Sequence, residues 1–264
     1  MSGFDFIDFG ASKGGSVEFA KARLGGTKGV GVDIDPKKVE QMLKDGYDCI
    51  QGDVTQLNLS PNSVRFVTMK HVLEHLPDLG AVRRTVECAA KAASDFLFIQ
   101  GPYFDADEYL EGFGLRFFWS YWSGHSCRLK TEDLRSILLD LGLEDFNMQV
   151  RYKVKDSNDP AIHPLSSPKN SHEYEPYVHP PKPSIRFSTP VYKEMVCYVR
   201  LRPFENWEKI IKATRERSIS EEAVAVIKTG VKRVFARTVW ALAPAFPQKI
   251  KTGVKKQLQR LFPN

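Results

Sequence analysis

The sequence has 264 residues, of which 42% are hydrophobic and 27% are charged, and its formal net charge is +6. This composition excludes an intrinsically disordered chain, and the sequence contains no run of about 20 apolar residues that would span a bilayer. The N-terminus lacks the basic and apolar regions of a signal peptide and the four cysteines form no CxxC pair, so we expect reduced thiols and a cytoplasmic location.

Basic residues gather near the C-terminus. Residues 223–264 contain nine Lys or Arg and no Asp or Glu, whereas residues 1–222 contain 29 basic and 32 acidic side chains. The hexapeptide IKTGVK occurs at 227–232 and again at 250–255. We expect 204–264 to form a basic helical extension, with 223–264 in peripheral contact with an anionic membrane. A solvated appendage, an oligomer contact and a nucleic-acid contact are the alternatives, and the last is disfavoured because basic residues alone are weak evidence for it.

Short apolar runs alternate with amphipathic segments through the first 102 residues. Pro36 suits the first turn of a helix that Gly46 closes. The strands that we predict cover 4–9, 29–35, 47–53, 64–70 and 95–102, and the helices cover 16–24, 36–46 and 79–93. This alternation predicts an α/β fold with a doubly wound, mostly parallel sheet.

The second half of the sequence is less regular. An aromatic insert at 102–125 contains FFWSYW, which either stacks on a planar or sugar ring or forms the core of a lid. The elements predicted after it are a helix at 130–143, a strand at 144–154, a Pro-, Ser- and His-rich loop at 155–190, a strand at 191–203 and helices at 205–217, 221–239 and 248–262. We expect 1–203 to be one domain whose insert 102–125 and loop 155–190 form the lid and substrate region.

The glycine-rich turn DFGASKGGS at 8–16 is typical of two enzyme classes, one that binds NAD(P) and one that binds S-adenosylmethionine. The short-chain dehydrogenases need a Tyr-x-x-x-Lys pair, and no tyrosine of this sequence is followed by lysine four residues later. These dehydrogenases also have an Asn-rich turn after the fourth strand, and this sequence has MKHVLEHLPD at that position. Asp8 lies within the first strand, where a buried carboxylate needs a cationic or hydrogen-bonding partner. These observations disfavour the dehydrogenase.

Five segments instead resemble a class I S-adenosylmethionine-dependent methyltransferase. They are FIDFGASKGGS, GVGVDIDP, QGDVTQL, VTMKHVLEHLPD and GHSCRLKTEDLRSILLDLGLEDF. The resemblance covers roughly residues 4 to 154, with VYKEMVCYVR as the last strand. It implies a Rossmann-like, seven-stranded methyltransferase fold.

The resemblance also implies a site for S-adenosyl-L-methionine at the carboxyl ends of the parallel strands. Asp8 would help to orient the ammonium group of the cofactor through water or nearby backbone. Asp33 would accept hydrogen bonds from both ribose hydroxyls, and Asp53 would meet the adenine amine or else cap the following turn. The residues assigned to the cofactor are Asp8, Gly10, Ser12, Gly14, Asp33, Ile34, Asp53, Val54 and Lys70.

Methyl transfer is a direct displacement, so the protein mainly aligns the nucleophile, and a hydroxyl nucleophile benefits from a general base. His71, His75 and His125 are the candidate bases. On a helix, His71, Glu74 and His75 would share one face, and that spacing could hold a divalent metal. The stretch is similar to one in ubiquinone-pathway O-methyltransferases. Because EHLPD is common at this helix with or without a metal, we predict a site without one.

The sequence therefore predicts S-adenosylmethionine-dependent O-methylation of a hydroxyl on a small molecule or a glycan, which is lipid-linked if the basic tail contacts a membrane. A non-catalytic binding protein with the methyltransferase fold is one alternative. A nucleic-acid methyltransferase is another, but MKHV stands where base N-methyltransferases often carry Asn/Asp-Pro-Pro-Tyr/Phe. The acceptor atom and the oligomeric state stay open.

Overall fold

The computed structural model of the chain describes residues 3–214, nearly all of which belong to one compact unit, Met1–Ala213. The basic segment 223–264, the IKTGVK repeat and the helices expected beyond residue 214 lie outside the described residues. No helix between residues 3 and 214 combines the length and hydropathy that a membrane crossing requires. All four cysteines are among the described residues and are free.

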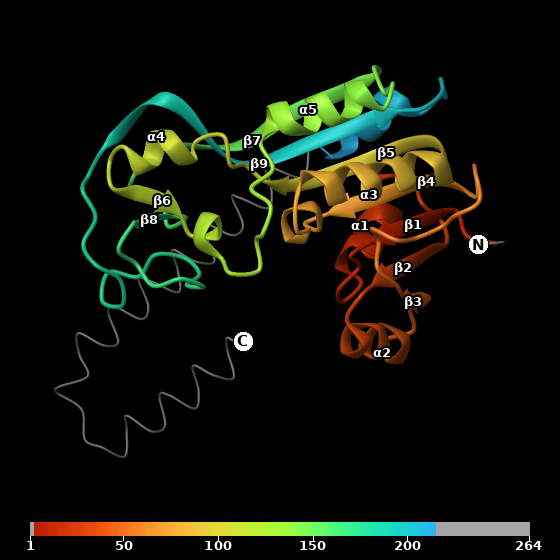
Figure 1. The fold of residues 1–264 in the computed structure, drawn as a ribbon, viewed down its shortest axis with the longest axis horizontal. Helices are drawn as coiled ribbons and strands as arrows, with labels where there is room; N and C mark the ends of the chain where they lie inside the picture. The colour runs from red at the N-terminus through yellow and green to blue at the C-terminus, as the bar shows by residue number, and fades with distance from the viewer. Residues whose placement is uncertain (1–2, 215–264) are drawn as a thin grey trace, which may run out of the picture. The chain divides into compact units, whose positions relative to one another are not determined.

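Seven strands form the main sheet (Figure 1). In sheet order they are β3 (Cys49–Gln51), β2 (Gly29–Asp33), β1 (Phe6–Phe9), β4 (Val64–Lys70), β5 (Ala93–Pro102), β9 (Arg186–Arg200) and β7 (Phe146–Asp156). The first five are mutually parallel, and β9 runs antiparallel to both of its neighbours. The predicted doubly wound, mostly parallel, seven-stranded sheet is therefore confirmed.

Successive residues of a strand point to opposite faces of the sheet, and β1 and β4 show why both faces are apolar. Ile7 of β1 and Val67 of β4 pack into one buried cluster, whereas Phe6 and Phe66 pack into a second cluster on the other face. The rings of Phe6 and Phe66 are stacked with their centroids 4.9 Å apart. A sheet that is buried on both sides needs helices on both sides.

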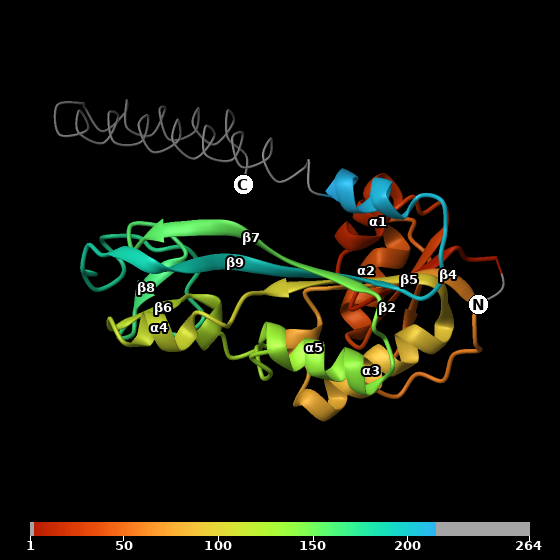
Figure 2. The same cartoon turned by 90° about the horizontal axis from the view of Figure 1, so that it is seen from above.

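Helices cover the two faces of this sheet (Figure 2). One face packs against α3 (Leu79–Ala92) and α5 (Thr131–Asp140). The other packs against α1 (Gly15–Arg23), α2 (Pro36–Lys44) and the helical residues 207–211. As expected, Pro36 opens α2, and Asp35 caps it by accepting a hydrogen bond from the N–H of Lys37. Between β1 and β5 the alternation of strands and helices fails once, because the chain passes from β3 to β4 without a helix.

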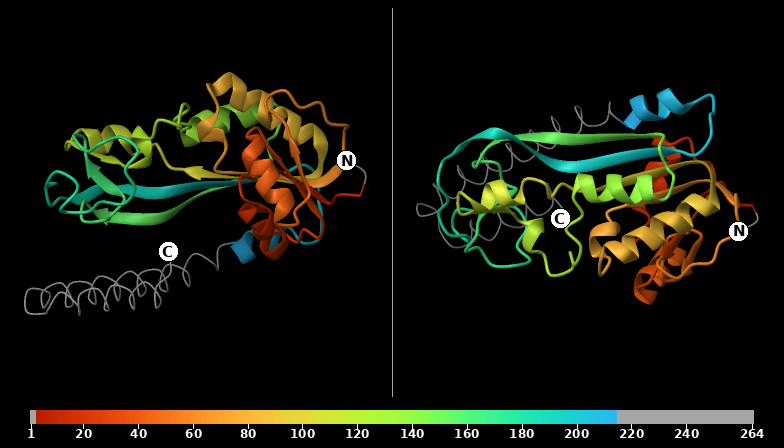
Figure 3. Two further views of the ribbon diagram at one scale, coloured as in Figure 1. Left: turned by 90° about the horizontal axis from the view of Figure 1, so that it is seen from below. Right: turned by 45° about the horizontal axis from the view of Figure 1, so that its top comes forward.

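The insert and part of the expected loop build a second, smaller structure at one end of β7 and β9 (Figure 3). Its elements are α4 (Asp107–Glu111), β6 (Leu115–Phe117), η2 (Trp119–Tyr121) and β8 (Ile162–Pro164). β6 pairs with β8, and both pack with Val154 and Val191 in a third apolar cluster. The prediction of a loop at 155–190 was wrong at its ends and at β8, because β7 and β9 extend as a paired ribbon to Asp156 and Arg186.

Candidate active site

A cavity of about 380 Å³ opens where β1, β2, β3 and β4 end. These strands are parallel and the sheet order reverses between β1 and β4, so their carboxyl ends and the loops that follow them leave a crevice there. The residues that line it are Gly10, Ser12, Asp33, Ile34, Lys38, Gly52, Asp53, Val54, Thr55, His71, Val72, His75, Leu76 and Pro77. The site therefore lies at the position that the order of the strands dictates.

The turn after β1 forms one wall of the cavity. Gly10 has φ +70°, and a Cβ atom there would come within 2.6 Å of the Val72 side chain. The N–H of Gly10 donates a 2.8 Å hydrogen bond to the carbonyl of Val32, which ties the turn to β2. Glycine is needed at this position both for its backbone conformation and for the close approach of Val72.

Asp33, the last residue of β2, is held beside this turn. Its Oδ2 accepts a 2.8 Å hydrogen bond from the N–H of Ser12, and its Oδ1 accepts a 2.9 Å hydrogen bond from the N–H of Asp35. Each carboxylate oxygen can accept about two hydrogen bonds, so both retain capacity toward the cavity. The next residue, Ile34, lines the cavity with 65% of its surface exposed, which is unusual for so large an apolar side chain.

Asp53 caps a turn as well as lining the cavity. Its Oδ1 accepts hydrogen bonds from the N–H and the hydroxyl of Thr55, at 2.9 and 2.7 Å, and its Oδ2 accepts one from Gln56 at 2.9 Å. These hydrogen bonds, the Thr55 pair first, lower the pKa of Asp53 and keep it ionised. The capping role considered for Asp53 is therefore present, and Oδ2 keeps room for a further donor.

Three of the residues assigned to the cofactor do not line the cavity. Asp8 is fully buried beneath the turn, where Ser16 and Thr68 donate hydrogen bonds to its carboxylate. Burial raises the pKa of Asp8 to about 6, against the opposing effect of the two hydroxyl donors. Gly14 faces the ring of Tyr47, and Lys70 ends β4 outside the lining. Asp8 therefore acts on the cavity through the turn that it anchors.

The candidate bases lie at different depths. His71 and His75 line the cavity, whereas His125 does not. His71 adopts φ +54° directly after β4, with Nδ1 3.4 Å from Oε1 of Glu74 and Nε2 3.7 Å from Oε1 of Glu194. Its ring thus lies between two carboxylates at the edge of the cavity.

The expectation that His71, Glu74 and His75 share a helix face was wrong. Leu73–His75 is a short 3₁₀ turn, η1, in place of an α-helix. Glu74 points into the protein with 2% of its surface exposed, and the ligand atoms that gather around it come from His75 and His125. Glu74 and His75 belong to the predicted set, whereas His125 belongs to the insert and replaces His71.

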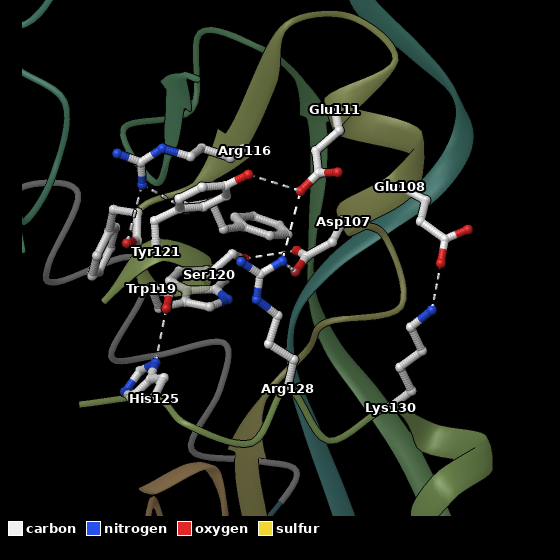
Figure 4. Close-up of polar contacts among 12 residues, drawn as sticks. Asp107, Glu108, Glu111, Arg116, Trp119, Ser120, Tyr121, His125, Arg128 and Lys130 are labelled. Carbon is white, nitrogen blue, oxygen red and sulfur yellow. Dashed lines mark hydrogen bonds and ion pairs between the residues drawn. The ribbon is translucent and has the colours of Figure 1, made fainter. Parts of the chain in front are cut away.

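The aromatic insert forms its own core (Figure 4). Phe117 and Trp119 are buried and stacked, with ring centroids 4.2 Å apart. Tyr121 lies between the guanidinium groups of Arg116 and Arg128, each 4.8 Å from its ring. None of these five residues lines the cavity.

A buried carboxylate organises the base of this insert. Ser120 donates a 2.7 Å hydrogen bond to Oδ1 of Asp107, and Arg128 lies 3.6 Å from Oδ2 (Figure 4). Burial is the largest influence on Asp107 and raises its pKa to about 6. Arg128 also lies 3.7 Å from Glu111, which accepts a hydrogen bond from Tyr121. The insert is therefore cross-linked by polar side chains as well as by its apolar core.

Sequence reasoning missed several lining residues, namely Lys38, Gly52, Thr55, Val72, Leu76 and Pro77. Thr55 and Gly52 flank residues that were predicted, so a wider window around Asp53 would have found them. Leu76 and Pro77 belong to the quoted segment EHLPD, which was considered only for its charged residues. Lys38 lies on α2 and carried no motif.

Comparisons with known proteins agree with this architecture. Residues 7–95 match the family model described as a methyltransferase domain. The chain is similar to a SAM-dependent methyltransferase from Archaeoglobus fulgidus, with a TM-score of 0.52, 15% identity, and coverage of 74% of this chain and 85% of that chain. It is also similar to the YcgJ protein from Bacillus subtilis, with a TM-score of 0.50, 13% identity, and coverage of 76% and 93%. No curated protein matches the chain.

Proposed function

We propose that the chain is a class I S-adenosylmethionine-dependent methyltransferase that transfers the methyl group to a hydroxyl of a small-molecule or glycan acceptor, and the match of residues 7–95 to a methyltransferase domain supports the first part of this proposal. The observation that carries the proposal is the crevice at the strand ends, which brings the glycine turn, Asp33 and His71 to one cavity. A cavity of about 380 Å³ is within the size range of small-ligand sites.

We assign the nucleoside part of the cofactor to the part of the cavity lined by Asp33, Ile34, Asp53 and Val54. The two ribose hydroxyls would donate to the carboxylate oxygens of Asp33, each of which already accepts one backbone N–H. Ile34 and Val54 offer apolar surface to the adenine ring, and Oδ2 of Asp53 can accept from its amine. An exposed isoleucine beside a buried aspartate suits a ligand that is flat and apolar at one end and hydroxylated at the other.

We assign the general base to His71. The acceptor oxygen would attack the methyl carbon, the carbon–sulfur bond would break with its electron pair passing to sulfur, and the hydroxyl proton would pass to the imidazole. Glu74 and Glu194, at 3.4 and 3.7 Å, would stabilise the positive charge that the ring then acquires. A hydroxyl must lose its proton as it attacks, so a base at this position suits a hydroxyl acceptor.

The acceptor class can be tested with methyl-labelled S-adenosylmethionine and the full-length protein. The panel would contain phenols and sugars, free glycans, and lipid-linked glycans in anionic vesicles, with product spectra that identify the labelled atom. Label on oxygen of one class supports the proposal. Label on nitrogen or on nucleic acid contradicts it, and cofactor binding without any turnover supports a non-catalytic binding protein.

A further inference from the structure

Two segments that are far apart in the sequence bring Glu74, His75 and His125 together. The N–H of Cys127 donates a 3.1 Å hydrogen bond to the carbonyl of Glu74, which fixes the segment after the insert beside η1. Each of the three residues offers one ligand atom, and these atoms lie within 4.8 Å of one another. Ligand atoms around one zinc-sized ion lie about 3–4 Å apart, so small side-chain movements would bring these three atoms to the spacing that an ion requires.

Hydrogen bonds to the backbone set the tautomers of both histidines. Nδ1 of His75 lies 2.7 Å from the carbonyl of Gly124, and Nδ1 of His125 lies 2.9 Å from the carbonyl of Trp119. A carbonyl oxygen can only accept, so each Nδ1 must carry the proton and each Nε2 keeps its lone pair. Metal-binding histidines nearly always donate their second ring N–H in this way.

The burial of the Glu74 carboxylate is a second reason to expect a cation at this position. Its side chain is 3% exposed, and Oε2 receives no hydrogen bond from any residue between 3 and 214. His71 approaches only the other oxygen, Oε1. A buried carboxylate is costly unless its charge is compensated, so this group is suited to receive a cation.

We propose that Glu74, His75 and His125 bind one divalent transition-metal ion through a carboxylate oxygen and two Nε2 atoms. Two imidazoles and one carboxylate match catalytic zinc sites, which keep one position open. The set differs from the one that the spacing suggested, because His125 replaces His71.

The role of the ion rests on the function proposed above. His75 also lines the cavity, so the open position would lie at the cavity edge and take the acceptor hydroxyl, whose pKa the ion would lower. The proton would still pass to His71, the oxygen–carbon bond would form, and the carbon–sulfur pair would leave with sulfur. The products are a methyl ether, S-adenosylhomocysteine and one proton.

Metal binding can be measured directly with the full-length, tag-free protein after treatment with a chelator. Zn²⁺ would be titrated by calorimetry, and Co²⁺ would be followed by its visible ligand-field absorption. We expect one ion per chain, with Glu74→Gln and His125→Gln each weakening binding by at least about tenfold, since even the loss of an outer-shell partner has an effect of that size. His172→Gln is the matched control, because His172 is exposed and lies outside the cluster.

S-adenosylhomocysteine affinity separates the two proposals. Glu74 and His125 do not line the cavity, so both variants should bind this ligand as the wild type does, which also shows that they are folded. If the wild type binds S-adenosylhomocysteine but no metal, or if all variants bind metal equally, the metal site is refuted and the methyltransferase proposal stands. If metal binds as described and S-adenosylhomocysteine does not bind, the metal site is supported and its role in methyl transfer is refuted.

Discussion

Oγ1 of Thr68 donates a 2.6 Å hydrogen bond to Oδ1 of Asp8, and the two residues are register partners on β4 and β1. Ser16, at the start of α1, donates to the second oxygen of the same carboxylate. The carboxylate is thereby held inside the protein beneath the glycine turn. Because burial outweighs these two donors, the pKa of Asp8 rises from its ordinary 3.8 to about 6.

This raised pKa predicts a pH-dependent stability. In the unfolded chain Asp8 ionises near its ordinary pKa, whereas the folded protein resists ionisation, so the contribution of Asp8 is fully present below about pH 4 and is lost as the pH rises through about 6. Asp8→Asn removes this loss. The free energy of unfolding of the variant minus that of the wild type should therefore increase by about 3 kcal/mol between pH 4 and pH 7, because the pKa of Asp8 differs by about two between the folded and unfolded protein. Urea unfolding of both proteins at each pH measures it, and parallel pH curves would contradict the assignment.

Gly10→Ala should weaken ligand binding in the cavity in addition to lowering the stability of the fold. Alanine at φ +70° costs about 1–2 kcal/mol, and its Cβ would also meet Val72 at 2.6 Å, which displaces a lining residue. Gly114→Ala is the matched control, with the same φ and no atom within 4 Å of the added Cβ. We expect both variants to lose stability and only Gly10→Ala to lose S-adenosylhomocysteine affinity, by at least about tenfold by calorimetry. Equal affinity in the two variants would exclude a role for the turn in binding.

His71→Gln should slow the chemical step without affecting the cofactor. A lost general base typically lowers kcat by about 10²–10⁴-fold. The acceptor found in the labelling assay is the substrate for this comparison of kcat. S-adenosylhomocysteine affinity should be unchanged. A normal kcat in the variant would show that His71 is not the general base.

Arg116→Lys should loosen the insert. Arg116 is buried, and its guanidinium donates to the carbonyls of Ser167 and Pro168, at 2.8 and 3.1 Å, as well as to those of Phe117 and Phe118. Lysine lacks the planar fork that reaches all four oxygens. We expect a loss of about 1–3 kcal/mol in the free energy of unfolding.

The exposed Arg83 on α3 provides the control for this substitution. Arg83→Lys should change the free energy of unfolding by less than about 0.5 kcal/mol. If Arg116→Lys is equally neutral in urea unfolding, the guanidinium does not link the insert to the segment around Ser167.

Local patterns were sufficient for the sheet and for most of the cavity. A buried strand that ends in Asp33, followed by Pro36 at the first helical turn, fixes a strand–helix unit without long-range information. Parallel strands then bring their carboxyl ends together, which is why Gly10, Asp33 and Asp53 were found in one place.

Contacts between distant segments could not be obtained in this way. His125 joins Glu74 only because the insert folds back and Cys127 bonds to η1. β8 was missed because its three residues acquire their strand geometry by pairing with β6, which lies about 50 residues earlier. The orientation of the Asp8 carboxylate depends on Thr68 and Ser16, which no motif connects to it.

The measurement that tests the central claim most directly is calorimetric titration of the full-length protein with S-adenosylhomocysteine. Asp33→Ala is the test variant, and Asp140→Ala is its control, because Asp140 is an exposed aspartate at the end of α5. NADH is the competing ligand. We predict micromolar binding of S-adenosylhomocysteine that survives in Asp140→Ala, is lost in Asp33→Ala, and has no counterpart with NADH. Binding of NADH in place of S-adenosylhomocysteine, or binding that is unchanged in Asp33→Ala, would contradict the account.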